Sequence, residues 1–196
     1  MNDGEFRRLT ARLSSVVSFS RVDLEAAYSH FAFHTYAPGE YVFSSGDVVR
    51  HVYFVMEGIG RYFYIDAGGK ERNKSLVRAG GAFASISSCV SDMPSPFFTQ
   101  AITRCTTASI EYRALIELSQ GNRNWAEFVR KLYENLVLKK EKREAAFLLL
   151  NARERYEQFL AEFAEDCEQV PLRQVAMYLG VTDVTLSRIR REMGLT

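Results

Sequence analysis

The chain carries short polar side chains and arginines, near its C-terminal end, at a spacing that suits contact with nucleic-acid bases. In residues 170–191 two short amphipathic segments meet at Gly180, and Ala176 lies one helical turn earlier. A small residue lets two helices cross closely, and glycine supplies the positive φ of a tight turn. The spacing predicts a helix-turn-helix in which Leu186 and Ile189 face the first helix. The residues left facing outward are Thr182, Asp183, Val184, Thr185, Ser187, Arg188 and Arg191.

These outward side chains have the chemistry of DNA recognition. An arginine can donate two hydrogen bonds to guanine, hydroxyls bond phosphate oxygens, and valine can contact a thymine methyl group. We therefore predict that the seven residues contact double-stranded DNA, with Arg188 at a base edge. The alternative is a solvated helical hairpin within a bundle. The ordered combination of small residue, turn glycine and arginine-bearing second helix favours DNA binding.

Composition places limits on how such a chain could bind DNA and where it works. Its 196 residues are 47% hydrophobic, enough for a core, but the net charge is only +1. DNA binding would thus need a local cationic patch, doubled by dimerisation. Cys89, Cys105 and Cys167 are dispersed and form no CxxC motif, which fits a reducing cytoplasm. Neither a signal-peptide pattern nor a membrane-length apolar run is present, so we expect a cytoplasmic protein without a membrane partner.

Apolar periodicity predicts an α+β fold in three parts. Residues 1–121 are expected to form a β-roll (jelly-roll) sensor domain, because short strand-like runs alternate with glycine turns from residue 36 to 112 and residues 4–33 have helical spacing. Residues 122–150 are expected to be one long helix, and residues 151–196 the helix-turn-helix domain.

The long helix predicts self-association. It has an apolar stripe with more surface than one small sandwich can cover, which favours a coiled-coil seam between two copies. The interface residues expected on this stripe are Trp125, Phe128, Leu132 and Leu136. The alternative is a helix packed only on its own β-domain.

Several short motifs give the chain a family resemblance. These are residues 38–40 (Pro-Gly-Glu), 45–47 (Ser-Gly-Asp) and 53–58 (Tyr-Phe-Val-Met-Glu-Gly), together with Glu71 and the segment 170–191. In this order they resemble the Crp/Fnr family of bacterial transcription regulators over nearly the whole chain. The resemblance implies a cyclic-nucleotide-binding-like domain, a homodimer and recognition helices in successive major grooves of an inverted-repeat operator. RNA polymerase would be a further partner of such a regulator.

We expect that the effector of such a domain in this chain is not a cyclic nucleotide. Members that bind one hold its phosphate with a Gly-Glu pair and an arginine beside a serine or threonine. Here Gly81 precedes Ala82, and residues 94–99 contain no cation, so a buried phosphate would lack compensation. We expect an unknown small molecule or no effector, and no cofactor. The candidate pocket residues are Gly81, Ala82, Phe83, Phe97, Phe98 and Thr99, of which the phenylalanines could equally be core.

Other chemistries find little support. His30 and His34 are four residues apart but have no apparent third ligand, so no metal site is expected. The β-region has no His-x-His pattern of a metalloenzyme, and no acid–base pair stands out. The sequence therefore predicts a DNA-binding transcription regulator and not an enzyme. The alternative is a small-molecule sensor or protein-interaction module with a vestigial helix-turn-helix.

Overall fold

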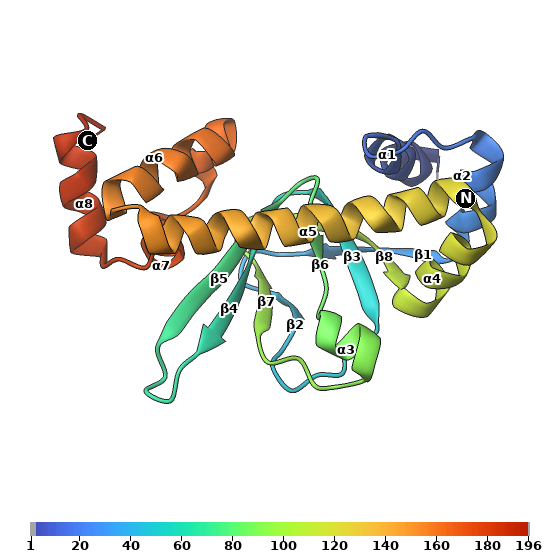
Figure 1. Ribbon diagram of the computed structural model, residues 1–196, viewed down its shortest axis with the longest axis horizontal. Coiled ribbons are helices and arrows are strands. Elements are labelled where there is room, and N and C mark those ends of the chain that lie inside the picture. The colour runs from blue at the N-terminus through green and yellow to red at the C-terminus, as the bar shows by residue number, and fades with distance from the viewer. Residues whose placement is uncertain (1–2, 196) are drawn as a thin grey trace.

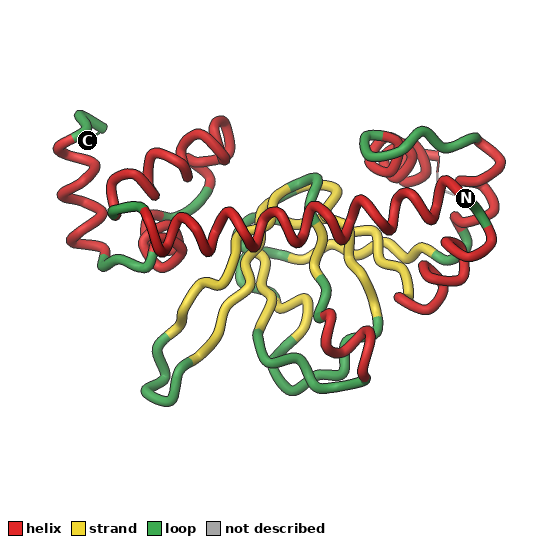
Figure 2. Tube along the Cα trace, viewed as in Figure 1, coloured by secondary structure: helices red, strands yellow, loops and turns green. Residues whose placement is uncertain are grey.

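The computed structural model describes residues 3–195 as a β-roll crossed by one long helix, with helices gathered at both ends of that helix (Figures 1 and 2). The N-terminal helices are α1 (Asp3–Ser14) and α2 (Arg21–Tyr28). Beyond the roll come α4 (Tyr112–Gly121), the long α5 (Arg123–Leu149), and a C-terminal unit of α6 (Ala152–Phe163), η1 (Ala164–Gln169), α7 (Leu172–Leu179) and α8 (Asp183–Glu192).

The β-roll consists of two four-stranded antiparallel sheets. One sheet has the order β1 (Phe31–Tyr36), β8 (Cys105–Glu111), β3 (His51–Glu57) and β6 (Ala82–Phe83). The other has the order β2 (Tyr41–Phe43), β7 (Phe98–Ala101), β4 (Ile59–Ile65) and β5 (Glu71–Arg78), and the short helix α3 (Ile86–Ser91) follows β6. The α+β class and the β-roll predicted from the sequence are confirmed.

Two local expectations need correction. Residues 29–33 do not continue the N-terminal helices, because α2 ends at Tyr28 and strand β1 begins at Phe31. Phe31 fits both periodicities, and pairing with Ile110 of β8 selects the strand. The helical spacing of Leu172, Val175, Ala176 and Leu179 also predicts one apolar face on the first helix of the motif, but Leu172 is 48% exposed and Tyr178 is buried there with the other three.

Trp125 and Phe128 belong to the core of a single chain. Each is 1% exposed, and both pack with Phe19 against the N-terminal helices and the roll. The expectation that these two residues form a dimer seam is wrong for that reason. Leu132 is also partly buried against this core. The exposed large apolar side chains of α5 within the described residues lie further along the helix, at Val137, Leu138, Phe147, Leu148 and Leu149.

The C-terminal unit packs directly on the roll. Its core contains Tyr156, Phe159 and Phe163, and the same cluster includes Ile59 of β4 and Leu76 of β5. This shared apolar core fixes the unit around the end of α5, where α7 lies next to β5 (Figure 1). None of the helices within residues 3–195 is long and apolar enough to cross a membrane.

Candidate nucleic-acid interface

The α7–α8 pair is joined by a tight turn at Gly180. This glycine has φ +71°, and its N–H donates to the last carbonyls of α7. Phe147 of α5 packs on the turn, since a Cβ at position 180 would lie 2.9 Å from Phe147 Cε1. Positive φ and close packing both require glycine here. The turn predicted from the sequence is therefore formed as its residue types indicate.

Helix α8 is fixed at its start and along its inner face. Thr182 is its N-cap, and the Thr182 hydroxyl accepts a hydrogen bond from the Thr185 amide at 3.2 Å. Leu186 and Ile189 are 1% and 5% exposed in the C-terminal core. With these two residues inside, the helix can present only its opposite face to solvent.

The predicted contact residues gather on that opposite face. Val184 is 80% exposed and the Arg188 side chain 65% exposed. Thr182, Asp183, Ser187 and Arg191 are exposed as well, whereas Thr185 is partly covered. The helix lies at the far end of the molecule from the N-terminal helices (Figure 1), and the roll does not cover this face.

The three arginines of α8 have different environments. Arg190 is turned inward: its guanidinium donates to the Tyr156 hydroxyl at 2.6 Å and to the Leu195 carbonyl at 2.8 Å. It braces α8 on α6 and does not add to the outward patch. Arg188 forms only an exposed 3.8 Å pair with Glu192, which is weak enough to exchange for a phosphate or base.

Arg173 is an exposed cation of this unit that sequence reasoning did not single out. It lies in the first turn of α7 and forms no ion pair with any residue in 3–195. The sequence signal that could have identified Arg173 was its position next to the apolar positions of α7, which places it on the exposed side of that helix.

The interior of the β-roll is filled with the chain's own aromatic side chains. Phe83 is 0% and Phe97 5% exposed, and Tyr62 stands edge-on to both rings. The Tyr62 hydroxyl also accepts from the Ala84 amide at 2.7 Å. At Gly81 a Cβ would lie 2.5 Å from Val77 Cγ1. This part of the expected effector pocket is therefore packed core.

The remaining pocket candidates do not converge. Thr99 is fully buried on the inner face of β7, whereas Phe98 points to the other face and stacks on Phe63 with ring centroids 5.2 Å apart. The expectation of one pocket lined by Gly81, Ala82, Phe83, Phe97, Phe98 and Thr99 is corrected accordingly.

A cation that the sequence reasoning missed lies at this aromatic cluster. Lys74 of β5 places its Nζ 3.6 Å from the centroid of the Phe97 ring and 5.4 Å from that of Tyr62. Burial lowers the pKa of Lys74 to about 8, and the nearby charge of Lys140 acts in the same direction. The sequence signal for this cation was a lysine within a strand. It was missed because Lys74 is distant in sequence from residues 94–99, where a cation was sought.

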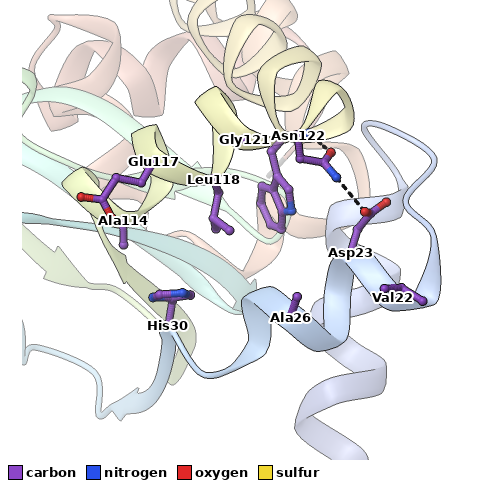
Figure 3. A pocket seen from close by; sticks show the side chains of 10 residues that line it. Val22, Asp23, Ala26, His30, Ala114, Glu117, Leu118, Gly121 and Asn122 are labelled. Carbon is purple, nitrogen blue, oxygen red and sulfur yellow. Dashed lines mark hydrogen bonds between the residues drawn. The ribbon is translucent and has the colours of Figure 1, made fainter.

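Cavities also lie outside the roll interior. A cleft of about 380 Å³ separates α2, α4 and the start of α5, where the Asn122 amide donates to Asp23 at 2.7 Å (Figure 3). His30 lines this cleft, but no three His, Cys, Asp or Glu side chains in residues 3–195 gather as metal ligands would. A groove of about 820 Å³ runs between α5, α6 and α7 beside Leu138 and Leu149.

Comparison with known proteins identifies the fold. Residues 33–122 match the family model of the cyclic nucleotide-binding domain. No curated protein matches the chain in sequence. The match covers the roll and α4, the part of the chain in which the effector site was expected.

Solved structures resemble nearly the whole chain. CLP, the c-di-GMP responsive global regulator of Xanthomonas campestris, has a TM-score of 0.70 at 17% identity, over 89% of this chain and 92% of that one. FixK2 of Bradyrhizobium japonicum has a TM-score of 0.72 at 18% identity, over 84% of both chains. The catabolite activator protein of Thermus thermophilus has a TM-score of 0.56 at 19% identity, over 93% of this chain and 86% of that one. The likeness shows that this chain shares their fold.

Proposed function

We propose that the protein is a homodimeric DNA-binding transcription regulator of the Crp/Fnr type. The observation that carries the proposal is the outward face of α8. Val184 and Arg188 are exposed on a capped helix whose inner face and preceding turn are held by core packing. A rigid helix with exposed apolar and guanidinium groups suits the major groove, where thymine methyls and guanine acceptors lie.

The second copy would pair along the C-terminal half of α5. Leu138 and Leu149 are 52% and 79% exposed, and they border the groove between α5 and α6. Apolar side chains repeated along one helix favour a helix–helix seam. Two α8 helices related by this seam would read an inverted repeat with half-sites about 34 Å apart.

The proposal includes an effector other than a cyclic nucleotide, or none. Phe83 and Phe97 occupy the roll interior, and the one cation there, among residues 3–195, is a lysine already engaged with aromatic rings. A cyclic phosphate would have to displace this packing and then find donors. Such a regulator would act in the cytoplasm, with RNA polymerase as its partner.

Selection of binding sites from random DNA tests the function. The purified chain should enrich an inverted repeat, and Arg188→Ala should relax the preference at one position in each half-site. Arg153→Ala, which removes an exposed arginine paired with Glu157 on α6, is the matched control and should leave the sequence preference unchanged. A wild-type chain that enriches no sequence would favour a sensor or interaction module instead.

A further inference from the structure

A buried guanidinium stands at the junction of the roll and the α7–α8 pair. Arg61 of β4 is 4% exposed. It donates to Gln100 Oε1 at 2.6 and 3.0 Å and to Glu71 Oε2 at 2.6 Å. It also donates to Gln174 Oε1 of α7 at 3.1 Å. A buried charge needs such partners, and Gln174 of α7 is one of them beside the partners within the sheet.

Asn73 of β5 makes a second connection to the same helix residue. Its Nδ2 lies 2.9 Å from both the backbone oxygen and Oε1 of Gln174, and its Oδ1 accepts from Arg61 at 3.2 Å. Asn73 is 5% exposed. Gln174 is therefore bonded from two neighbouring strands, β4 and β5. Two such bonds fix both the lateral position of α7 on the sheet and its distance from the sheet.

The surroundings allow little freedom at this contact. Arg143 of α5 donates to the backbone oxygens of both Asn73 and Tyr178, at 3.2 and 3.0 Å. Arg78 at the end of β5 pairs with Asp166 of η1 at 3.1 Å. These contacts tie the C-terminal unit to β5, and Arg143 also reaches α7 at Tyr178. The bonds to Gln174 are the ones that join α7 directly to side chains of β4 and β5.

We infer that Arg61 and Asn73 are positioning residues for DNA recognition, which hold α7 through Gln174 and so set the orientation in which α8 meets DNA. The inference rests on the proposed DNA-binding function. The outward face of α8 is exposed in this arrangement, as contact with DNA requires. In a dimer both recognition helices must fit grooves at a fixed spacing, and a loosened α7 lowers the fraction of chains that fit.

Substitutions at Gln174 test the inference with the full-length chain and its selected operator. Gln174→Ala removes both acceptor bonds and should weaken DNA binding about three- to tenfold by lowering the competent fraction. Gln174→Glu keeps an oxygen that can accept from Arg61 and Asn73 and should restore most of the affinity at moderate salt. Gln169→Ala, in η1, removes a glutamine side chain whose bond stays within η1, to Asp166, and should change nothing.

A second measurement separates positioning from folding. Hydrogen–deuterium exchange without DNA should be faster in α7 and β5 for Gln174→Ala, while the exchange of α4 and the thermal midpoint of the roll stay at wild-type values. Asn73→Ala leaves the Arg61 bond to Gln174 in place and serves as the milder variant. Combined with Gln174→Ala it should add less than its separate loss, because the bond to α7 that it then removes is the one from Asn73 Nδ2 to the Gln174 backbone oxygen.

The possible failures are distinguishable. A wild-type chain that binds no DNA overturns the proposed function itself. A wild-type chain that binds DNA, with a folded Gln174→Ala variant that binds equally well or more tightly, overturns only the positioning role.

Discussion

Placing charges on the exposed part of α5 should convert the proposed dimer to a monomer. The proposed change is Leu138→Glu together with Leu149→Glu. Eleven residues apart, at about 100° per residue, these positions lie within about 20° of each other around the helix. Both leucines border the groove beside α6.

The magnitude follows from the exposed fractions. At 52% and 79% exposure, the two leucines leave a little more than one whole side chain uncovered per chain. A symmetric dimer would cover the equivalent of between two and three whole leucine side chains. At about 1.5–3 kcal/mol for each fully buried leucine, their removal should cost roughly 5 kcal/mol of association free energy. That corresponds to a dissociation constant raised by between about three and four orders of magnitude, before any repulsion between the glutamates.

Light scattering at micromolar concentration, coupled to size-exclusion chromatography, measures the result. The wild type should be dimeric and the double variant monomeric with an unchanged thermal midpoint. Val22→Glu is the matched control, because Val22 is 74% exposed on α2, far from the groove. Leu132→Glu should instead lower the thermal midpoint, since Leu132 packs on the N-terminal core. A double variant that remains dimeric, or a monomeric wild type, would refute the reasoning.

Four further outcomes are expected. Arg188→Ala should cost about 1–3 kcal/mol of operator affinity in gel-shift titrations, with unchanged affinity for scrambled DNA. Gly180→Ala should lower the free energy of unfolding by about 1–3 kcal/mol in urea denaturation, because alanine at φ +71° is strained and its Cβ meets Phe147. Trp125→Ala should lower it by about 3–5 kcal/mol, and a smaller loss would contradict the core assignment. Burial lowers the pKa of Lys74 from 10.5 to about 8, so the folded chain disfavours the protonated amine below pH 8 and this cost disappears as the pH rises toward 10.5. The stability of Lys74→Met relative to wild type should thus fall between pH 8 and 10.5, and a constant difference would argue against a lowered pKa.

Local sequence signals predicted the parts of the molecule that depend on local chemistry. The turn at Gly180 and the inner face at Leu186 and Ile189 each follow from residues within one or two helical turns. The roll followed from the repeated alternation of strands and glycine turns. These features need no knowledge of what lies across the core.

Long-range packing explains what the sequence could not predict. The stripe on α5 indicated that Trp125 and Phe128 are covered, but periodicity does not say whether the cover is a second copy or Phe19 of the same chain. The Arg61 contact joins residues up to 113 positions apart. An arginine between Gly60 and Tyr62 in an apolar strand was a sign of a buried partner, but the partner lay in another part of the fold.

The β4–β5 hairpin joins the packed interior of the roll to α7, the helix that precedes the proposed DNA-binding helix α8. Successive side chains of a strand point to opposite faces of a sheet. Arg61 therefore reaches out to α7 while the next residue, Tyr62, lies among the aromatic rings of the roll interior. On β5, Asn73 bonds α7 while Lys74, at a break in the strand register, lies over Phe97. The residues that pack in the roll interior, Tyr62 and Lys74, are thus adjacent in sequence to Arg61 and Asn73, which contact α7. We therefore expect this hairpin to make the proposed DNA-binding face sensitive to the roll without a ligand having to reach α7 itself.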